Sequence, residues 1–299
     1  MIDTRRLRTL RAVADHGTVT AAAAALHLTP SAVSQQLGAL EHEVGHKLLT
    51  RDGRGVTLTA VGRIMVAHAD EVLAQLERAE AEVAAYATGV AGEVTVASFA
   101  TAIAAVLSPA IRALRTSSPG LQVRVRDAEG DQSLTMLLDG EADLAIAVEY
   151  RGAPDDHRLT RLPLYAEPFD LVLPADHPLT APPLSALAKE TWIGPYPGNP
   201  VHDVIAVACE REGFAPHFAH SSDDFRAVVA LVGAGAGVAL VPRLALRDLD
   251  LTGVLVRQAH GPERRVFAAI RRGAERHPLL RPLLGALKDT ARETGLTTG

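Results

Sequence analysis

Apolar and small residues recur at steps of three and four near the start of the chain, and this spacing predicts two short helices. The first covers residues 19–26, and the second begins at Pro30 after a break at 27–29. Proline suits the first position of a helix, and the hydroxyl of Thr29 before it can cap the free N–H groups. We expect the two helices to pack through Ala21, Ala22 and Ala25 of the first and Val33, Leu37 and Leu40 of the second.

The opposite face of the second helix carries short polar side chains, which can donate to and accept from base edges and phosphates in a DNA major groove. Residues 51–57, RDGRGVT, then predict a glycine-turned hairpin, or wing, whose arginines can reach the DNA backbone or minor groove. A plain helical hairpin without a DNA role is the alternative. The order of these parts favours DNA binding. The predicted DNA contacts are Thr29, Pro30, Ser31, Ser34, Gln35, Gln36, Arg51 and Arg54.

Residues 59–88 contain no proline and predict one long helix that begins behind Thr59. Apolar side chains recur at three- and four-residue steps if His68 is counted among them. His68 is then expected to lie in a helix–helix contact rather than to act as a ligand. Such a stripe favours a coiled-coil-like contact between two copies of the helix. The alternative is an amphipathic helix packed on its own domain. The stripe comprises Val61, Met65, Val72, Leu76, Ala79, Val83 and Tyr86.

Beyond Gly92 the pattern changes to short strands that alternate with helices, which is typical of an α/β fold. The order predicts two lobes joined by two crossovers, with a cleft between them. In such sheets a ligand binds at the carboxyl ends of the strands. The predicted segments are 93–98, 103–114, 122–126, 133–138 and 143–148, then 168–173, 192–193, 204–211, 224–232, 238–241 and 265–270 before a C-terminal helix.

Four segments resemble one family in order along the chain. TPSAVSQQLGALEHEVGHKLLTRDGRGVTLTAVG (29–62) is similar to the winged-helix signature of LysR-type transcriptional regulators. GEADLAIAV (140–148), LVLPADHPL (171–179) and GAGAGVALVP (233–242) resemble landmarks of that family's effector-binding domain. Leu49 and Thr50 depart from the family pattern, which commonly has an aromatic or acidic residue before the arginine, so the packing of the wing is expected to differ slightly.

The resemblance implies an α/β chain with a mainly α winged helix-turn-helix at its N-terminus, a long dimerising linker helix, and a two-lobed α/β effector domain resembling periplasmic binding proteins. The expected boundaries are 1–58 for the DNA-binding domain, 59–89 for the linker helix and 90–299 for the effector domain, with lobe I at about 90–162 and 264–299 and lobe II at about 163–263.

Loops that follow strands or begin helices supply the expected effector contacts, and the family's ligand-contacting loops fall on the same places. Three of these residues have alternatives: Glu129 as a solvated loop acid, Glu149 with Tyr150 as the start of the crossover, and Asp223 as a helix N-cap. Since no arginine or lysine lies in these loops, the sequence predicts an effector that is neutral or held by backbone amides. The predicted contacts are Ser98, Phe99, Thr101, Glu129, Glu149, Tyr196, Asn199, Asp223 and Phe225.

Charge is unevenly distributed along the 299 residues. The net charge is −5, yet residues 1–60 carry seven Arg and Lys against five Asp and Glu. The attraction to DNA is therefore expected to be local to the head, modest per subunit and doubled by dimerisation. The apolar content of 47% is ample for buried cores.

Several other classes of site find little support. No signal peptide or membrane span is readable, so we expect a cytoplasmic protein. The single Cys209 is expected to pack in a helix. The glycine run at 233–237 follows a helix and precedes a strand, which favours a helix-ending turn over a nucleotide-binding loop. His217 and His220 are expected to be solvated or packed rather than metal ligands.

Three function classes remain: a ligand-controlled DNA-binding regulator, a small-molecule binding module with a vestigial head, and an enzyme without a recognisable active-site motif. The resemblance favours the regulator and not an enzyme, with no cofactor and no bound metal. The expected partners are double-stranded DNA, a small-molecule effector, further copies of the chain in a homodimer or homotetramer, and RNA polymerase if the protein is an activator; no membrane partner is expected.

Overall fold

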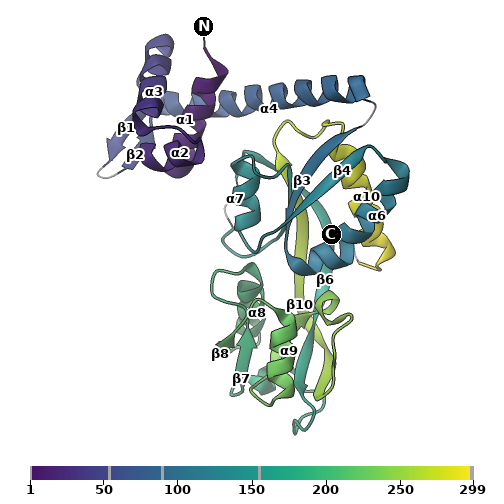
Figure 1. Ribbon diagram of the computed structural model, residues 1–299. Coiled ribbons are helices and arrows are strands. Elements are labelled where there is room, and N and C mark those ends of the chain that lie inside the picture. The colour runs from purple at the N-terminus through teal and green to yellow at the C-terminus, as the bar shows by residue number, and fades with distance from the viewer. Residues whose placement is uncertain (1, 53–54, 89–90, 154–155, 297–299) are drawn as a thin grey trace.

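The computed structural model describes residues 2–52, 55–88, 91–153 and 156–296 (Figure 1). A small head at the N-terminus is followed by one long helix, and the remaining chain forms two α/β lobes placed end to end (Figure 1). Among the described residues, no helix combines the length and the apolar character that crossing a membrane requires.

The head is a helical bundle with a two-stranded wing. Both predicted helices are present, and the Thr29 hydroxyl accepts a hydrogen bond from the N–H of Ala32 at 3.2 Å, so the predicted cap is confirmed. The wing strands pair antiparallel, with Leu49 opposite Leu58. The elements are α1 (Thr4–His16), α2 (Val19–Ala25), α3 (Pro30–Val44), β1 (Leu49–Asp52) and β2 (Gly55–Leu58).

Packing within the head follows the predicted periodicity of α3 but not that of α2. In α2, Ala22 is buried as predicted, whereas Ala21 and Ala25 are exposed and Ala23 is buried instead. The reason is that α2 is only seven residues long and presents one narrow face to its neighbours. The predicted buried stripe of α3 is confirmed at Val33, Leu37 and Leu40.

The long helix α4 (Ala60–Thr88) begins where the sequence predicts, since the Thr59 hydroxyl accepts the N–H of Gly62 at 2.9 Å. In the single chain Val72 of the predicted stripe is 41% exposed and His68 is also exposed, so the predicted contact with a second copy of the helix stays a prediction. The head and the first lobe cover an adjacent face of the helix. The residues buried there are Val66, Ala69, Leu73 and Ala74.

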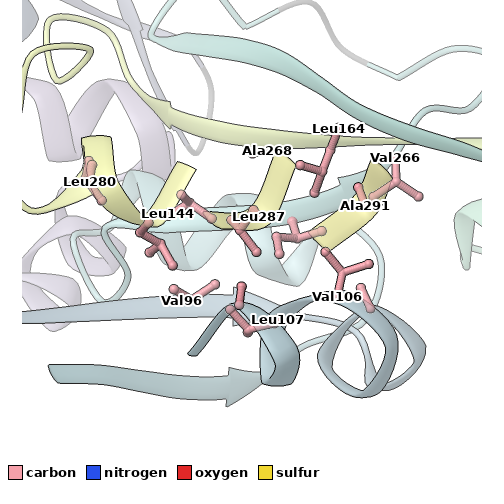
Figure 2. Packing of buried hydrophobic residues seen from close by; sticks show 14 of the residues in the cluster. Val96, Val106, Leu107, Leu144, Leu164, Val266, Ala268, Leu280, Leu287 and Ala291 are labelled. Atoms are coloured by element: carbon pink, nitrogen blue, oxygen red, sulfur yellow. The ribbon is translucent and has the colours of Figure 1, made fainter. Parts of the chain in front are cut away.

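The first lobe contains three parallel strands whose carboxyl ends lie side by side. Ser98 at the end of β3 pairs with Asp127 of β4 and with Ile146 of β5. Helices α6 and α10 cover one face of this sheet around a core of aliphatic residues (Figure 2), and α7 covers the other. The elements are β3 (Gly92–Ser98), α5 (Ala100–Ala102), the π-helical turn η1 (Ile103–Leu107), α6 (Ser108–Ser117), β4 (Leu121–Asp127), α7 (Gln132–Leu138), β5 (Leu144–Val148) and α10 (Leu280–Glu293).

The second lobe repeats the α/β pattern. The buried Cys209 packs in α8, and the glycine run ends α9 before β9 begins, as the sequence predicts. The strand β8, which holds His217 and His220, was not predicted, because its sequence HFAHS shows no clear alternation of apolar and polar residues. The elements are η2 (Leu184–Leu187), β7 (Thr191–Gly194), α8 (Pro200–Arg211), β8 (His217–Ser221), α9 (Phe225–Gly233), β9 (Ala239–Pro242) and η3 (Arg243–Leu246).

Two long strands, β6 (Leu159–Pro174) and β10 (Val254–Arg271), run through both lobes as the two predicted crossovers (Figure 1). They pair antiparallel along their length, with two irregularities in register, between Gln258 and Glu263 and between Val266 and Phe267. The six-stranded sheet therefore has the order β4-β3-β5-β10-β6-β9. The sequence predicted only the most apolar part of each crossover, because their polar residues break the run.

Candidate DNA interface and effector cleft

The N-terminal half of α3 presents the predicted polar face to solvent. Ser31, Ser34 and Gln35 are exposed there, and the hydroxyls of Thr29 and Ser31 are 3.0 Å apart. Because side chains on successive turns of a helix share a face, these groups form one surface that can enter a groove.

Gln36 lies at the side of this surface. Its side-chain oxygen accepts a hydrogen bond from the hydroxyl of Thr9 in α1, so this end of the amide is already occupied within the head. Of the predicted contacts in the wing, Arg54 and the side chain of Arg51 lie outside the described residues.

Between the two lobes lies a hollow of about 530 Å³, which we call the cleft. The starts of α5, α8 and α9 contribute to its wall, as expected for ligand sites in α/β sheets. The structure brings six of the predicted contacts together in this wall: Phe99, Thr101, Glu129, Asn199, Asp223 and Phe225.

The other three predicted contacts do not line the cleft in this structure. Ser98 is fully buried beneath the sheet end. Glu149 lines a separate hollow with Tyr150 and Arg151, because the chain turns away from the cleft after β5. Tyr196 is 56% exposed, and only its backbone N–H reaches inward, to Asp223 at 3.1 Å.

Asp223 is not the cap of α9. That role belongs to Asp224, whose side chain accepts the N–H of Arg226 at 2.8 Å. The carboxylate of Asp223 instead accepts hydrogen bonds from the Tyr196 N–H and from the side-chain amide of Asn199, each at 3.1 Å. Asp223 thus holds the loop before α8 in place in the wall of the cleft. The interpretation of Asp223 as the N-cap was wrong by one residue, since Asp224 is the cap.

A buried ion pair that was not predicted from the sequence has one member, Arg264, in the wall of the cleft. Arg264 is 1% exposed, and its guanidinium donates to Glu167 at 2.6 Å and to the Thr101 hydroxyl at 2.6 Å. The guanidinium carbon also lies 4.9 Å from the centre of the Phe99 ring. Glu167 in turn accepts the N–H of Leu244 at 2.9 Å. This pair ties both crossover strands to the start of α5 and to η3.

Arginines therefore do line the cleft, contrary to the sequence prediction. Besides Arg264, the wall contains Arg226 and Arg247. Two of the three were missed because they lie in a crossover strand and after a short 3-10 helix, where no loop motif marks them. Arg226 directly follows Phe225, which was predicted as an effector contact, but Arg226 itself was not predicted.

A second group of charges joins the head to the first lobe. We call it the head–lobe cluster and define it as Arg11, Asp15, Asp70, Asp156 and Arg158. Arg158 pairs with Asp15 of α1 and with Asp156, while Arg11 lies 3.3 Å from Asp70 of α4. Burial raises the pKa of Asp70, and burial together with nearby Arg11 lowers the pKa of Arg158 to about 10.

Two further contacts continue this junction onto α7. The guanidinium of Arg11 donates to the carbonyl of Leu138 at 2.8 Å, and His16 lies 3.5 Å from Asp139. Helix α1 therefore touches both the lobe that carries one wall of the cleft and the helix α3 that carries the exposed polar face.

Comparison with known proteins agrees with this architecture. Residues 4–63 match the model of the bacterial regulatory helix-turn-helix protein, lysR family, and residues 87–292 match the LysR substrate binding domain. The regulator AlsR of Bacillus subtilis is 31% identical over 265 residues, covering 84% of each chain. A probable hydrogen peroxide-inducible genes activator of Streptomyces viridosporus is 30% identical over 298 residues, covering 96% of this chain and 94% of its own.

Solved structures give the same result. The OxyR C206 mutant of Corynebacterium glutamicum has a TM-score of 0.62 at 26% identity, covering 99% of this chain and 96% of its own. Full-length CbnR complexed with its target DNA has a TM-score of 0.56 at 26% identity, covering 97% of this chain and all of its own. The winged helix-turn-helix head, the long helix and the two-lobed domain with its cleft thus identify this chain as a member of the LysR family of transcriptional regulators.

Proposed function

We propose that this regulator reads an inverted-repeat DNA site with two copies of α3 and that a small molecule in the cleft controls this binding. The observation that carries the proposal is the exposed row of Ser31, Ser34 and Gln35 at the start of α3, which is left free by a fully packed head. In helix-turn-helix proteins, residues at the start of the second helix contact base edges, and paired heads read half-sites about one DNA turn apart.

The long helix α4 supports pairing of two chains. Ile64, Val72 and Val83 are 58%, 41% and 69% exposed, respectively, although each is an aliphatic side chain on a helix. Burying these side chains against a second copy of α4 removes apolar surface from water. Tyr86, the last residue of the predicted stripe, has a side chain outside the described part. A homodimer or homotetramer is the proposed assembly, with RNA polymerase as a further partner if the protein activates.

We propose that the head–lobe cluster transmits the state of the cleft to the head. Closing the cleft moves the lobes relative to one another, and any change in lobe I reaches α1 through Arg158, Asp15 and Arg11. The ligand can shift the head only as far as it binds the two arrangements with different affinity.

A gel-retardation assay tests the DNA-binding proposal. It uses DNA from upstream of the protein's own gene, with scrambled DNA of equal length as competitor, and is run at two salt concentrations. Specific retention at the higher salt supports the proposal, because non-specific binding is mainly electrostatic and is lost first. If selection from a whole-genome DNA library also finds no preferred sequence, the chain is a binding module with a vestigial head.

The first variant to test is Gln35→Ala. Loss of a good base contact is expected to weaken specific binding by about 1–3 kcal/mol while leaving non-specific binding nearly unchanged. Titrations on specific and scrambled DNA measure the two losses separately. The matched control is Gln132→Ala, which removes an exposed glutamine in the first lobe. Equal losses on both DNAs for Gln35→Ala contradict base recognition by this residue.

The coupling proposal predicts the effect of Arg158→Met. Removing this guanidinium leaves Asp15 and Asp156 without their shared partner, and the head–lobe contact is expected to weaken by about 1.5–3 kcal/mol. Hydrogen exchange in α1 should become faster while the lobe core stays protected. Arg124→Met, which breaks the exposed pair with Glu93, serves as the control. Unchanged exchange in α1 contradicts the coupling role.

A further inference from the structure

The second helix of the helix-turn-helix, α3, presents short and uncharged side chains to solvent. Ser31, Ser34 and Gln35 are exposed there, and the side chains of Ser34 and Gln35 form no hydrogen bond with any described residue. The helix contains no arginine or lysine. A serine hydroxyl lies only two bonds from Cα, so it can reach a base edge only if the helix backbone itself comes close to the DNA.

The two acidic side chains of α3 are bound within the head. Glu41 accepts hydrogen bonds from the ammonium group of Lys47 at 2.6 Å and from the N–H of Leu48 at 2.9 Å. Glu43 lies 2.6 Å from the guanidinium of Arg6 in α1. Both negative charges are therefore offset by the head, at the end of α3 that is remote from Ser31.

Gly38 continues the polar face by one further turn. It is exposed, four residues after Ser34 and three after Gln35, and residues at these spacings share a face of a helix. Its φ lies outside the left-handed region, and an added Cβ atom would meet nothing within 4 Å. Neither the backbone conformation nor the packing of the described chain therefore requires glycine at this position.

Glycine inside a helix also lowers its stability. Relative to alanine it loses more backbone freedom on folding. An open glycine alone does not indicate a binding partner, since α10 contains another at Gly285. Gly38 differs from Gly285 in its position, because it adjoins the polar side chains of the second helix of a helix-turn-helix.

A side chain at position 38 would cover this polar surface. The Cα–Cβ bonds of a helix point toward its N-terminus, so each side chain lies over the turn that precedes it. For position 38 that turn contains Ser34 and Gln35. The absence of a side chain leaves both groups uncovered and leaves the helix backbone beside them accessible.

We propose that Gly38 keeps the DNA-facing surface of α3 open, so that the wall of the major groove contacts the helix backbone beside Ser34 and Gln35. The inference rests on the proposed reading of DNA by α3. Gly38 acts here as a positioning residue, because it sets how closely the short side chains approach the base edges. Its contribution is to sequence-specific binding, in which the helix enters the groove.

Gly38→Ala tests the inference, because its two expected effects have opposite signs. The unfolding temperature is expected to rise by about 1–3 °C, since alanine favours the helix. Binding to specific DNA is expected to weaken about fivefold or more, because an extra methyl group in a close contact forces the two surfaces apart. Binding to scrambled DNA should change little, since it is mainly electrostatic.

Thermal unfolding and gel retardation of the full chain measure these effects. The specific DNA is the fragment from upstream of the protein's own gene or the best sequence from a whole-genome selection. Gly285→Ala is the matched control, which should also raise the unfolding temperature but leave DNA binding unchanged. Gly38→Gln adds a longer uncharged side chain and should weaken specific binding more than Gly38→Ala. Light scattering should give the same mass for all three variants.

The outcomes separate the role of Gly38 from the function. Unchanged binding of Gly38→Ala to specific DNA, an equal loss on specific and scrambled DNA, or a lowered unfolding temperature each overturns the inference. A changed mass also overturns it, because the face would then bind a second copy of the chain. In each case the proposed function stands if the unchanged protein prefers specific to scrambled DNA. An unchanged protein that never shows this preference contradicts the proposed function and the inference together.

Discussion

Replacing Glu167 with alanine is expected to lower the free energy of unfolding by about 3–5 kcal/mol, because it leaves a buried guanidinium without its counter-charge. Arg264 is 1% exposed and Glu167 is fully buried, so water cannot replace the lost carboxylate. The backbone N–H of Leu244 loses its acceptor in the same step. Both crossover strands depend on this pair, so we expect the two lobes to lose their fixed arrangement together.

Chemical denaturation of the full chain measures the loss in the free energy of unfolding. Two further variants serve as comparisons. Glu167→Gln keeps an acceptor for Leu244 but removes the charge, so its loss in stability should fall between those of the alanine variant and the unchanged protein. Glu263→Ala removes an exposed partner of Arg265 in the same strand β10 and should cost at most about 1 kcal/mol. Similar stabilities for Glu167→Ala and Glu263→Ala contradict the central role of the buried pair.

The second large effect is expected for Gly62→Ala, in the first turn of α4. A Cβ atom at this position would overlap the backbone carbonyl oxygen of Leu48. That carbonyl accepts the N–H of Thr59 at 2.9 Å, and neither group is a side chain that can rotate away. We expect a loss of stability on the order of 1–3 kcal/mol or more, as in other overpacked sites, with a shift of the wing relative to α4.

Thermal unfolding and DNA retention measure the two consequences of Gly62→Ala. Gly285→Ala is the matched control, since it also lies in a helix, at a position where nothing lies within 4 Å of an added Cβ atom. This control is expected to stabilise the chain by about 0.4–1 kcal/mol through the unfolded state. A Gly62→Ala protein as stable as Gly285→Ala contradicts the close approach of α4 to Leu48.

Local features of the fold were predictable because they depend on residues within one turn of each other. The Thr29 cap, the start at Pro30 and the buried positions of Val33, Leu37 and Leu40 all follow from spacing and from the hydrogen bonds that a helix start leaves open. The loops at strand ends were predictable for a similar reason, since parallel strands bring their carboxyl ends to one edge. This rule correctly placed three residues in the wall of the cleft: Phe99, Thr101 and Glu129.

Only the tertiary structure decided which charges meet. Arg264 and Glu167 are 97 residues apart, and their pairing requires two crossover strands to lie side by side. The head–lobe cluster likewise needs the head to rest on the lobe, and Glu149 left the cleft because the chain turned after β5. The sequence by itself determined the winged head, the long helix and the α/β order, because those depend on periodicity and capping. The charge that a ligand meets in the cleft was decided by long-range packing, because burial and pairing settle which groups remain available.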